Sequence, residues 1–216
     1  MDVAVAGGHG KVALRLLRIL SERGDRALGL IRNPDQASDL EAVGATPAGA
    51  DLENLDPDAI ATTISGCDAV VFAAGAGPGS GSERKLTMDY GGAVKLIAAA
   101  QTKGISRYVI VSSQGADPDA QGDDTFAVYL QAKGKADEEL RSSGLDYSIV
   151  RPTGLTDEPG AGTVEIAEQV ERGQISRDDV AGVLVAVLDE PATIGKTFAL
   201  GPGDVPIEEA VAQLRR

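Results

Sequence analysis

Tyr129 and Lys133 are the two residues of this sequence whose types and spacing best suit acid–base chemistry. They stand four residues apart in a segment of helical periodicity, so both side chains lie on one side of the helix. An ammonium close to a phenol favours the ionised phenolate, which makes Tyr129 a candidate proton donor and acceptor. Ser113 precedes Tyr129 by sixteen residues, a separation that a strand-to-helix connection can span. The alternative is that Tyr129 only packs on the helix face.

A glycine turn at residues 7–10 offers a second kind of chemistry, the binding of phosphate. It follows a short apolar run and precedes a segment of helical periodicity. Gly7 allows a tight turn, Gly10 lets a ligand approach the backbone, and Ala13 is small enough for the helix to pack on the strand. The free N–H groups and partial positive charge of the helix N-terminus then favour a pyrophosphate. A tight turn without a ligand is the alternative.

Strands and helices alternate along the sequence, and this alternation must position the residues above. Apolar runs predict strands at 3–6, 27–31, 46–49, 69–73, 108–112, 147–151 and 196–200. Helical periodicity predicts helices at about 11–23, 35–42, 57–64, 85–103, 126–143, 178–189 and 206–215. Strands separated by helices imply right-handed crossovers and hence a mostly parallel sheet covered by helices on both faces. We therefore expect one doubly wound, three-layer α/β domain over residues 1–216. Residues from about 152 would form a small C-terminal region on the substrate side.

The glycine-rich loops 75–81 and 159–162 both follow predicted strands. In open α/β sheets ligands bind at the carboxyl ends of the strands, which makes these loops candidates for closing on a ligand. Surface loops are also commonly just mobile connections, and this remains the alternative.

The composition excludes several classes of function. A formal net charge of −13 disfavours nucleic acid and anionic membrane surfaces as partners, because binding them needs clustered Lys and Arg. No apolar run is long enough to span a membrane, and Met1 leads directly into a strand, so we expect a cytoplasmic protein. Cys67 is the only cysteine and is expected to be a packing residue. With His9 as the only histidine, we expect no metal site.

Arg32, at the end of the second predicted strand, indicates which dinucleotide the site would take. This position faces the adenosine ribose, where a carboxylate suits the 2′-hydroxyl and a planar guanidinium suits a 2′-phosphate. Arg32 therefore favours NADP(H), with NAD(H) possible, unless it is a solvated residue at a strand end. Asp51 and Leu52 follow the third strand and suit the adenine amino group and ring. The small residues 73–75 follow the fourth strand, where backbone must approach the ribose and pyrophosphate.

The order and spacing of these motifs resemble the atypical short-chain dehydrogenase/reductase family, and within it the small NAD(P)-binding, NmrA-like and epimerase/dehydratase-like group. The resemblance spans almost the whole chain. The motifs that carry it are Gly7-x-x-Gly10-x-x-Ala13, Arg32-Asn33-Pro34, Asp51-Leu52, Ala73-Ala74-Gly75, Val111-Ser112-Ser113, Tyr129-x-x-x-Lys133 and the segment from Asp146 to Pro152.

The resemblance implies a Rossmann fold that binds NAD(P) along the carboxyl edge of its sheet. It also implies that Tyr129, Lys133 and Ser113 are catalytic, with the hydroxyls at the substrate oxygen and the lysine also holding the nicotinamide ribose. The residues that it places around the dinucleotide are Gly7, Gly8, His9, Gly10, Lys11, Val12, Arg32, Asn33, Asp51, Leu52, Ala73, Ala74, Gly75, Ser112, Lys133, Pro152, Thr153 and Leu155.

The family resemblance favours an NADP(H)-dependent oxidoreductase that acts on a small carbonyl, quinone or flavin-like substrate. A non-catalytic NAD(P)-binding redox sensor is the alternative, and a sugar-nucleotide-type epimerase or dehydratase is a second one. Asp89 stands where many extended family members carry Asn, so a full catalytic tetrad is not implied, and its carboxylate is either structural or carries a proton. We expect a monomer or homodimer with no nucleic-acid or membrane partner.

Overall fold

The computed structural model describes residues 1–77 and 79–215, so Pro78 of the expected loop 75–81 lies outside the described residues. Within these residues nine strands form one sheet, and two more form a separate pair. The strands of the sheet are β1 (Asp2–Ala6), β2 (Arg26–Ile31), β3 (Thr46–Gly49), β4 (Ala69–Phe72), β5 (Arg107–Val111), β6 (Asp146–Pro152), β8 (Thr163–Ala167), β10 (Lys196–Pro202) and β11 (Val205–Pro206). The separate pair consists of β7 (Gly154–Thr156) and β9 (Gln174–Ser176).

The strand order in the sheet is β11-β8-β10-β6-β5-β4-β1-β2-β3. Neighbours from β3 to β10 pair in parallel, whereas β8 and β11 add antiparallel pairs at one edge. The chain starts in the middle of the sheet and builds outwards in both directions, as a doubly wound fold requires. The predicted α/β class with a mostly parallel sheet is confirmed.

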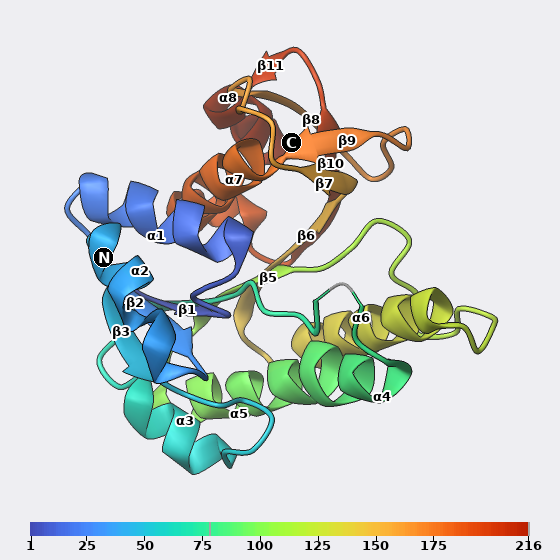
Figure 1. Cartoon of the computed structure of the whole chain (residues 1–216). Helices are drawn as coiled ribbons and strands as arrows, with labels where there is room; N and C mark the ends of the chain where they lie inside the picture. Colours follow the sequence, from blue (N-terminus) through green and yellow to red (C-terminus); the bar gives the residue numbers. More distant parts are fainter. Residues whose placement is uncertain (78, 216) are drawn as a thin grey trace.

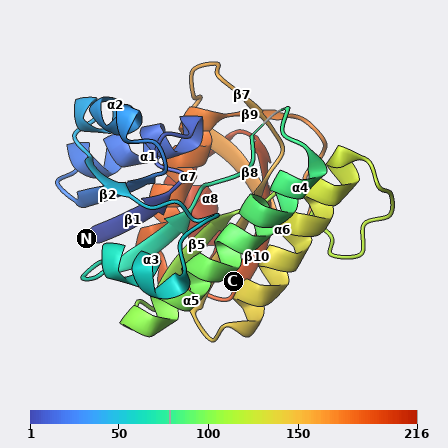
Figure 2. The same cartoon turned by 60° about the horizontal axis from the view of Figure 1, so that its bottom comes forward.

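Helices cover both faces of the sheet, as Figures 1 and 2 show from two directions. One face carries α1 (Lys11–Glu22), α7 (Arg177–Asp189) and α8 (Ile207–Ala212). The other carries α3 (Pro57–Thr63), α5 (Ala93–Lys103) and α6 (Thr125–Ser142). The remaining helical segments are α2 (Ala37–Ala42), α4 (Ser82–Arg84), the π-helical η2 (Lys85–Gly92) and the 3₁₀ turns η1 (Pro34–Gln36), η3 (Pro191–Thr193) and η4 (Gln213–Arg215).

Strand β1 explains how the two cores arise from one sequence pattern. Successive side chains of a strand point to opposite faces. Val3 and Val5 therefore join the core beneath α1 and α7, while Ala4 and Ala6 join the core beneath α5. All four are fully buried, which is why the strand is a continuous apolar run rather than an alternating one.

The predicted strands all form, with ends that differ by at most two residues. The helix predicted at 85–103 differs, because its first part winds as the π-helical η2 and only residues 93–103 are α-helical. The π turn places Lys85, Asp89 and Gly92 in the interior, and such turns are common at functional sites. Strands β7, β8, β9 and β11, which are between two and five residues long, were not predicted.

Among the helices of residues 1–77 and 79–215, none combines the length and the apolar character that crossing a membrane requires.

Gly134 lets α6 approach the loop that precedes it. A Cβ atom built at Gly134 would lie 2.2 Å from the backbone nitrogen of Pro118 and 2.3 Å from the carbonyl carbon of Asp117. Both are backbone atoms, which cannot rotate away. Since Lys133 is the preceding residue, this contact also fixes the depth at which the lysine stands in the fold.

A buried ion pair joins α6 to β5 and β6. The Asp137 carboxylate is fully buried, and its Oδ2 accepts from Ser112 Oγ at 2.9 Å and from Arg151 Nε at 3.0 Å. Such pairs are costly to break because one charge is then left uncompensated in the interior. The hydroxyl of Ser112 and the guanidinium of Arg151 are therefore held in fixed positions at the ends of their strands.

The packing at Gly134 predicts that Gly134→Ala lowers the free energy of unfolding by about 2 kcal/mol, because a methyl group must be forced against backbone. Gly182→Ala in α7 is the matched control. There the added methyl meets only the terminal methyl of Ile207, at 2.9 Å, and alanine favours the helix by about 1 kcal/mol over glycine. Urea unfolding measures the free energy of unfolding of both variants. Equal destabilisation by the two substitutions would contradict the prediction that close packing on the backbone requires glycine at position 134.

Burial raises the pKa of Asp137, and the contacts with Arg151 and Ser112 only partly oppose the rise. The Asp137 carboxyl therefore binds its proton more tightly in the folded protein than in the unfolded chain. This protonation adds to the free energy of unfolding, and its contribution is fully present below about pH 4, near the ordinary pKa of a free Asp. As the pH rises through the folded-state pKa, the wild type should lose free energy of unfolding relative to Asp137→Asn, whose amide does not titrate. Urea unfolding across this pH range tests the sign, and a relative gain by the wild type would refute it.

Candidate functional site

Three cavities lie along the carboxyl edge of the parallel sheet. The Arg32 cavity, of about 230 Å³, is lined by the glycine turn, the end of β2, residues 50–53 and Arg84. The central cavity, of about 710 Å³, is lined by the start of α1, the ends of β4 and β5, and residues of η2 and α6. The Arg151 cavity, also about 710 Å³, lies between the start of α6, the end of β6 and residues 168–173.

The cavities share walls and follow one another as a single path. Gly10 and residues 73–75 line both the Arg32 cavity and the central cavity. Phe126, Tyr129 and Leu155 line both the central cavity and the Arg151 cavity. A ligand could therefore extend from Arg32 past the glycine turn to Tyr129.

The charges along this path differ from those of the rest of the molecule. Eight of the 20 Lys and Arg residues line the three cavities, compared with four of the 33 Asp and Glu residues. Clefts lined by one sign of charge concentrate ligands of the opposite sign. Although the protein as a whole is acidic, the walls of the three cavities carry more cationic than acidic residues, which suits an anionic ligand.

The glycine turn brings β1, β4 and α1 into close contact. Gly7 adopts a positive φ of 76°, and a Cβ atom there would lie 2.7 Å from Ala74 Cα. Gly10 is the N-cap of α1, and among the described residues no side chain caps this helix or places an acidic group in its first turn. The N–H groups of the first turn are therefore left to bind an anion.

Lys133 is buried between four elements. Its ammonium donates to Val111 O at 3.1 Å and to Ala74 O at 3.4 Å, and it lies 3.4 Å from Asp89 Oδ1. It also lies 5.5 Å from the ring centre of Phe72. A buried cation needs such partners, and they hold the lysine at the floor of the central cavity.

Tyr129 stands at the junction of the central and Arg151 cavities, with two ammonium groups near its ring. Lys133 Nζ is 6.0 Å from the centre of its ring and Lys85 Nζ is 5.5 Å away. Phe126, which is 66% exposed, stacks on the ring with centres 6.1 Å apart. The predicted proximity of Tyr129 and Lys133 is present, and Lys85 adds a second cation, which is held by Gly77 O at 2.9 Å.

Asp89 lies behind this cluster. Its Oδ2 accepts from the N–H of Ala76 at 3.0 Å, so it anchors the chain that follows β4. Its Oδ1 is buried without a hydrogen-bond partner among the described residues, since the nearby Lys133 lies within ion-pair distance but not in hydrogen-bond geometry. The carboxylate thus has both a structural contact and one unfilled acceptor at the central cavity.

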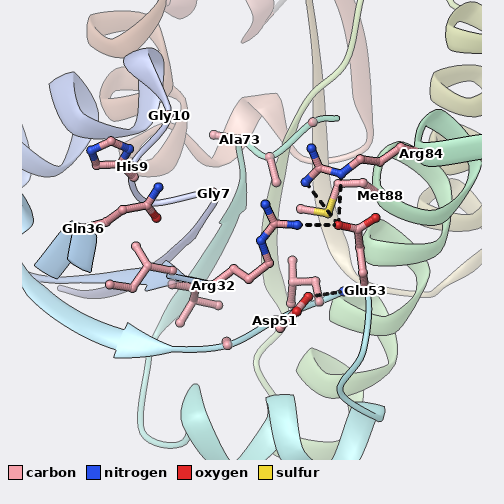
Figure 3. A pocket seen from close by; sticks show the side chains of 16 residues that line it. Gly7, His9, Gly10, Arg32, Gln36, Asp51, Glu53, Ala73, Arg84 and Met88 are labelled. Carbon is pink, nitrogen blue, oxygen red and sulfur yellow. Dashed lines mark hydrogen bonds and ion pairs between the residues drawn. The ribbon is translucent and has the colours of Figure 1, made fainter. Parts of the chain in front are cut away.

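Arg32 and Arg84 reach into the Arg32 cavity from opposite walls and meet at Glu53, as Figure 3 shows. Arg32 Nη1 donates to Glu53 Oε2 at 3.1 Å, and Arg84 donates to the same oxygen from Nε at 3.2 Å and from Nη2 at 3.1 Å. Burial would raise the pKa of Glu53, but hydrogen bonds from Thr87 and Arg84 and the charges of both guanidinium groups outweigh it and hold that pKa below its ordinary value.

The other predicted residues at this end are occupied by local contacts. Asp51 accepts from the N–H of Glu53 at 3.0 Å and from Asn54 at 2.8 Å. Asn33 Oδ1 accepts from the N–H of Asp35 and caps η1. Asp51 and the neighbouring, buried Leu52 both line the Arg32 cavity. Their contacts with an adenine ring stay predictions.

His9 of the glycine turn and Lys11, which follows the turn, each contact a carboxylate. His9 Nε2 lies 2.7 Å from Asp39 Oδ2, and His9 lines the Arg32 cavity. Lys11 is paired with Asp157, which follows β7, and lines the central cavity together with Val12. The turn is therefore linked to the C-terminal part of the chain across the central cavity.

The predicted residues after β5 and β6 face different cavities. Ser112 lines the central cavity, but its hydroxyl donates to Asp137. Ser113 lines the Arg151 cavity, where Pro152 and Thr153 also lie. Ser113 and Tyr129 thus share the Arg151 cavity, and Lys133 lies in the adjoining one.

Three residues of the site were not predicted from the sequence: Glu53, Arg84 and Lys85. Arg84 and Lys85 belong to the segment that follows the glycine-rich loop, and their spacing matches no motif. The sequence signal that existed was the position of this segment after a strand end, where ligands bind.

Comparison with known proteins places the chain in a family. A model of the NAD(P)H-binding family matches residues 7–191. A protein of Bacillus subtilis (strain 168) named uncharacterised sugar epimerase YhfK is 41% identical over 215 residues, which cover 99% of this chain and 100% of the relative.

Two solved structures share the fold over nearly their full length. One, from Bacillus halodurans, is described as an NAD-dependent epimerase/dehydratase; it is 41% identical, covers 99% of each chain and has a TM-score of 0.91. The oxidoreductase ylbE from Lactococcus lactis is 27% identical, covers 99% of this chain and 96% of its own, and has a TM-score of 0.86. Sequence motifs, fold and relatives agree, and the chain belongs to the NAD(P)H-binding family.

Proposed function

We propose that this protein is an NADP(H)-dependent oxidoreductase that reduces a small carbonyl, quinone or flavin-like substrate. The observation that carries the proposal is the continuous path of cavities, with Arg32 at one end and Tyr129, close to two ammonium groups, at the other. In this proposal the dinucleotide occupies the Arg32 and central cavities, and the substrate occupies the Arg151 cavity.

The residues along the path fit a dinucleotide. The first turn of α1, uncapped by any described side chain, suits the pyrophosphate. Ala73 and Gly75 allow close approach of ribose to the backbone. The unfilled acceptor on Asp89 suits a hydroxyl or amide donor in the central cavity. The excess of cations along the walls matches the charge of the ligand.

Tyr129 is proposed as the proton donor to the substrate oxygen. When bound, the nicotinamide would supply a hydride, which a carbonyl substrate takes at its carbon. The Tyr129 hydroxyl gives its proton to the carbonyl oxygen of such a substrate, which becomes a hydroxyl, and the tyrosine regains a proton from solvent. The ammonium groups of Lys85 and Lys133 lie beside the ring and stabilise the negative charge that the tyrosine carries in between.

The preference for NADP(H) rests on Arg32. Its side chain is 56% exposed and lines the cavity, and among the described residues Nη1 is the nitrogen of its guanidinium that donates a hydrogen bond, to Glu53. A guanidinium binds a phosphate through paired hydrogen bonds, whereas a 2′-hydroxyl gains much less from it. The same site in NAD-specific proteins carries a carboxylate after the second strand.

The cofactor preference predicts that NADPH binds more tightly than NADH, and that Arg32→Ala weakens NADPH about tenfold or more, since hydrogen bonds to charged groups contribute about 1.5–3 kcal/mol. NADH should change little. Arg18→Ala, which removes an exposed arginine of α1 outside the three cavities, is the charge-matched control. Titration by NAD(P)H fluorescence checks both, and equal affinities in the wild type would remove the preference.

The catalytic assignment predicts that Tyr129→Phe lowers kcat by about 10²–10⁴-fold, the range of a lost general acid, while NADPH affinity stays close to that of the wild type. The measurement is NADPH oxidation against a panel of aldehydes, quinones and flavins. Tight NADPH binding without turnover of any substrate would instead support the non-catalytic redox sensor. Exchange of configuration without net NADPH oxidation would support an epimerase.

A further inference from the structure

Glu53 is an anion that the protein itself places between two arginines. Its side chain is 16% exposed, and its Oε2 accepts from both Arg32 and Arg84. Its Oε1 accepts from Thr87 at 2.7 Å. Its backbone oxygen accepts from Lys95 Nζ at 2.7 Å. Five donors on four side chains therefore fix this residue in the wall of the Arg32 cavity.

The two guanidinium groups come from separate parts of the chain. Arg32 follows β2, and Arg84 ends α4 on the other side of the cavity (Figure 3). The third nitrogen of Arg84, Nη1, donates to Ala76 O at 3.0 Å, which aims the other two at the cavity. Arg84 thus presents two nitrogens and Arg32 one to the same oxygen, and guanidinium groups with paired donors are the ones that proteins use to bind phosphate.

One arginine would be enough to neutralise the charge of Glu53, yet two arginines contact it. Arg32, Arg84 and Glu53 taken alone carry a formal charge of +1, and Asp51, which lines the same cavity, brings the sum to zero. The oxygens of Asp51 accept from the N–H of Glu53 and from Asn54, so among the hydrogen bonds of the described residues Glu53 is the carboxylate that the two arginines share. A phosphate monoester carries about −1.5 to −2 at neutral pH and offers three acceptor oxygens. It would pair with both arginines, whereas Glu53 would repel it.

Building on the proposed function, we propose that Arg84 and Arg32 together bind the 2′-phosphate of the dinucleotide, and that Glu53 is an internal competitor for the two arginines. Arg84 is then a second specificity-determining residue, contributed from the opposite wall. Glu53 limits how strongly the site discriminates between the phosphorylated and the unphosphorylated dinucleotide.

The test uses isothermal titration of the full chain with 2′,5′-ADP and with 5′-AMP, which differ only in the 2′-phosphate. Arg84→Ala should lower the ratio of the two affinities about tenfold, as expected for a charge-assisted contact. Glu53→Gln keeps an amide acceptor for Thr87 but removes the charge, so it should raise the ratio about three- to fivefold. Arg18→Ala is the control and should leave the ratio unchanged.

Two results would overturn the inference. One is an Arg84→Ala variant that weakens both nucleotides equally, because Arg84 would then act on the adenosine and not on the phosphate. The other is a Glu53→Gln variant with a lower ratio, because Glu53 would then position the arginines rather than compete for them. Thermal unfolding of each variant separates these outcomes from a loss of the fold.

The test also separates this inference from the proposed cofactor preference. Suppose that the wild type binds 2′,5′-ADP more tightly than 5′-AMP, and that the ratio of these affinities falls in Arg32→Ala but not in Arg84→Ala. The proposed preference for NADP(H) is then supported, and the proposed role of Arg84 is refuted. If the wild type binds the two nucleotides equally, or binds neither, both fail.

Discussion

The buried ammonium of Lys133 is the interaction on which the site depends. It joins α6 to the ends of β4 and β5 and to η2 through Ala74, Val111 and Asp89. An unpaired ammonium in this position would cost several kcal/mol, so the contacts of Lys133 help to hold the four elements in their relative positions. The depth of α6 is in turn set by the missing side chain of Gly134. Tyr129, one helical turn before Lys133, takes its place at the cavity junction as a consequence.

Local sequence patterns predicted the fold well because they encode what a parallel sheet requires. The apolar run at β1 and the stripe of buried residues on α1 are each sufficient to specify their elements. The cluster of Tyr129 and Lys133 also follows from helical spacing alone. The π-helical turn at η2 could not be predicted, since the same residues also suit an α-helix. Strand β11 was missed because two residues are too few for a period to appear. Strand β8 has five residues, but Glu165 interrupts its apolar run, so it did not stand out as the continuous apolar runs of the central strands did.

The contacts that were not predicted are those between segments distant in the sequence. Nothing near Glu53 indicates that Arg32 and Arg84 will meet at its carboxylate, because one lies 21 and the other 31 residues away. The same holds for Lys11 and Asp157, which are 146 residues apart. Such pairs depend on the order of strands in the sheet, which brings the ends of β2 and β4 to the same edge on either side of β1.

The short segment formed by α4 and η2 faces two parts of the path at once. Arg84 points into the Arg32 cavity, while the next residue, Lys85, lines the central cavity beside Tyr129. Adjacent residues cannot move independently, because they share a peptide bond. If the proposed function holds, a backbone shift of this segment moves Arg84 in the Arg32 cavity and Lys85 beside Tyr129 together. Substitutions in α4 or η2 that change how the dinucleotide binds are then expected to change the surroundings of Tyr129 as well.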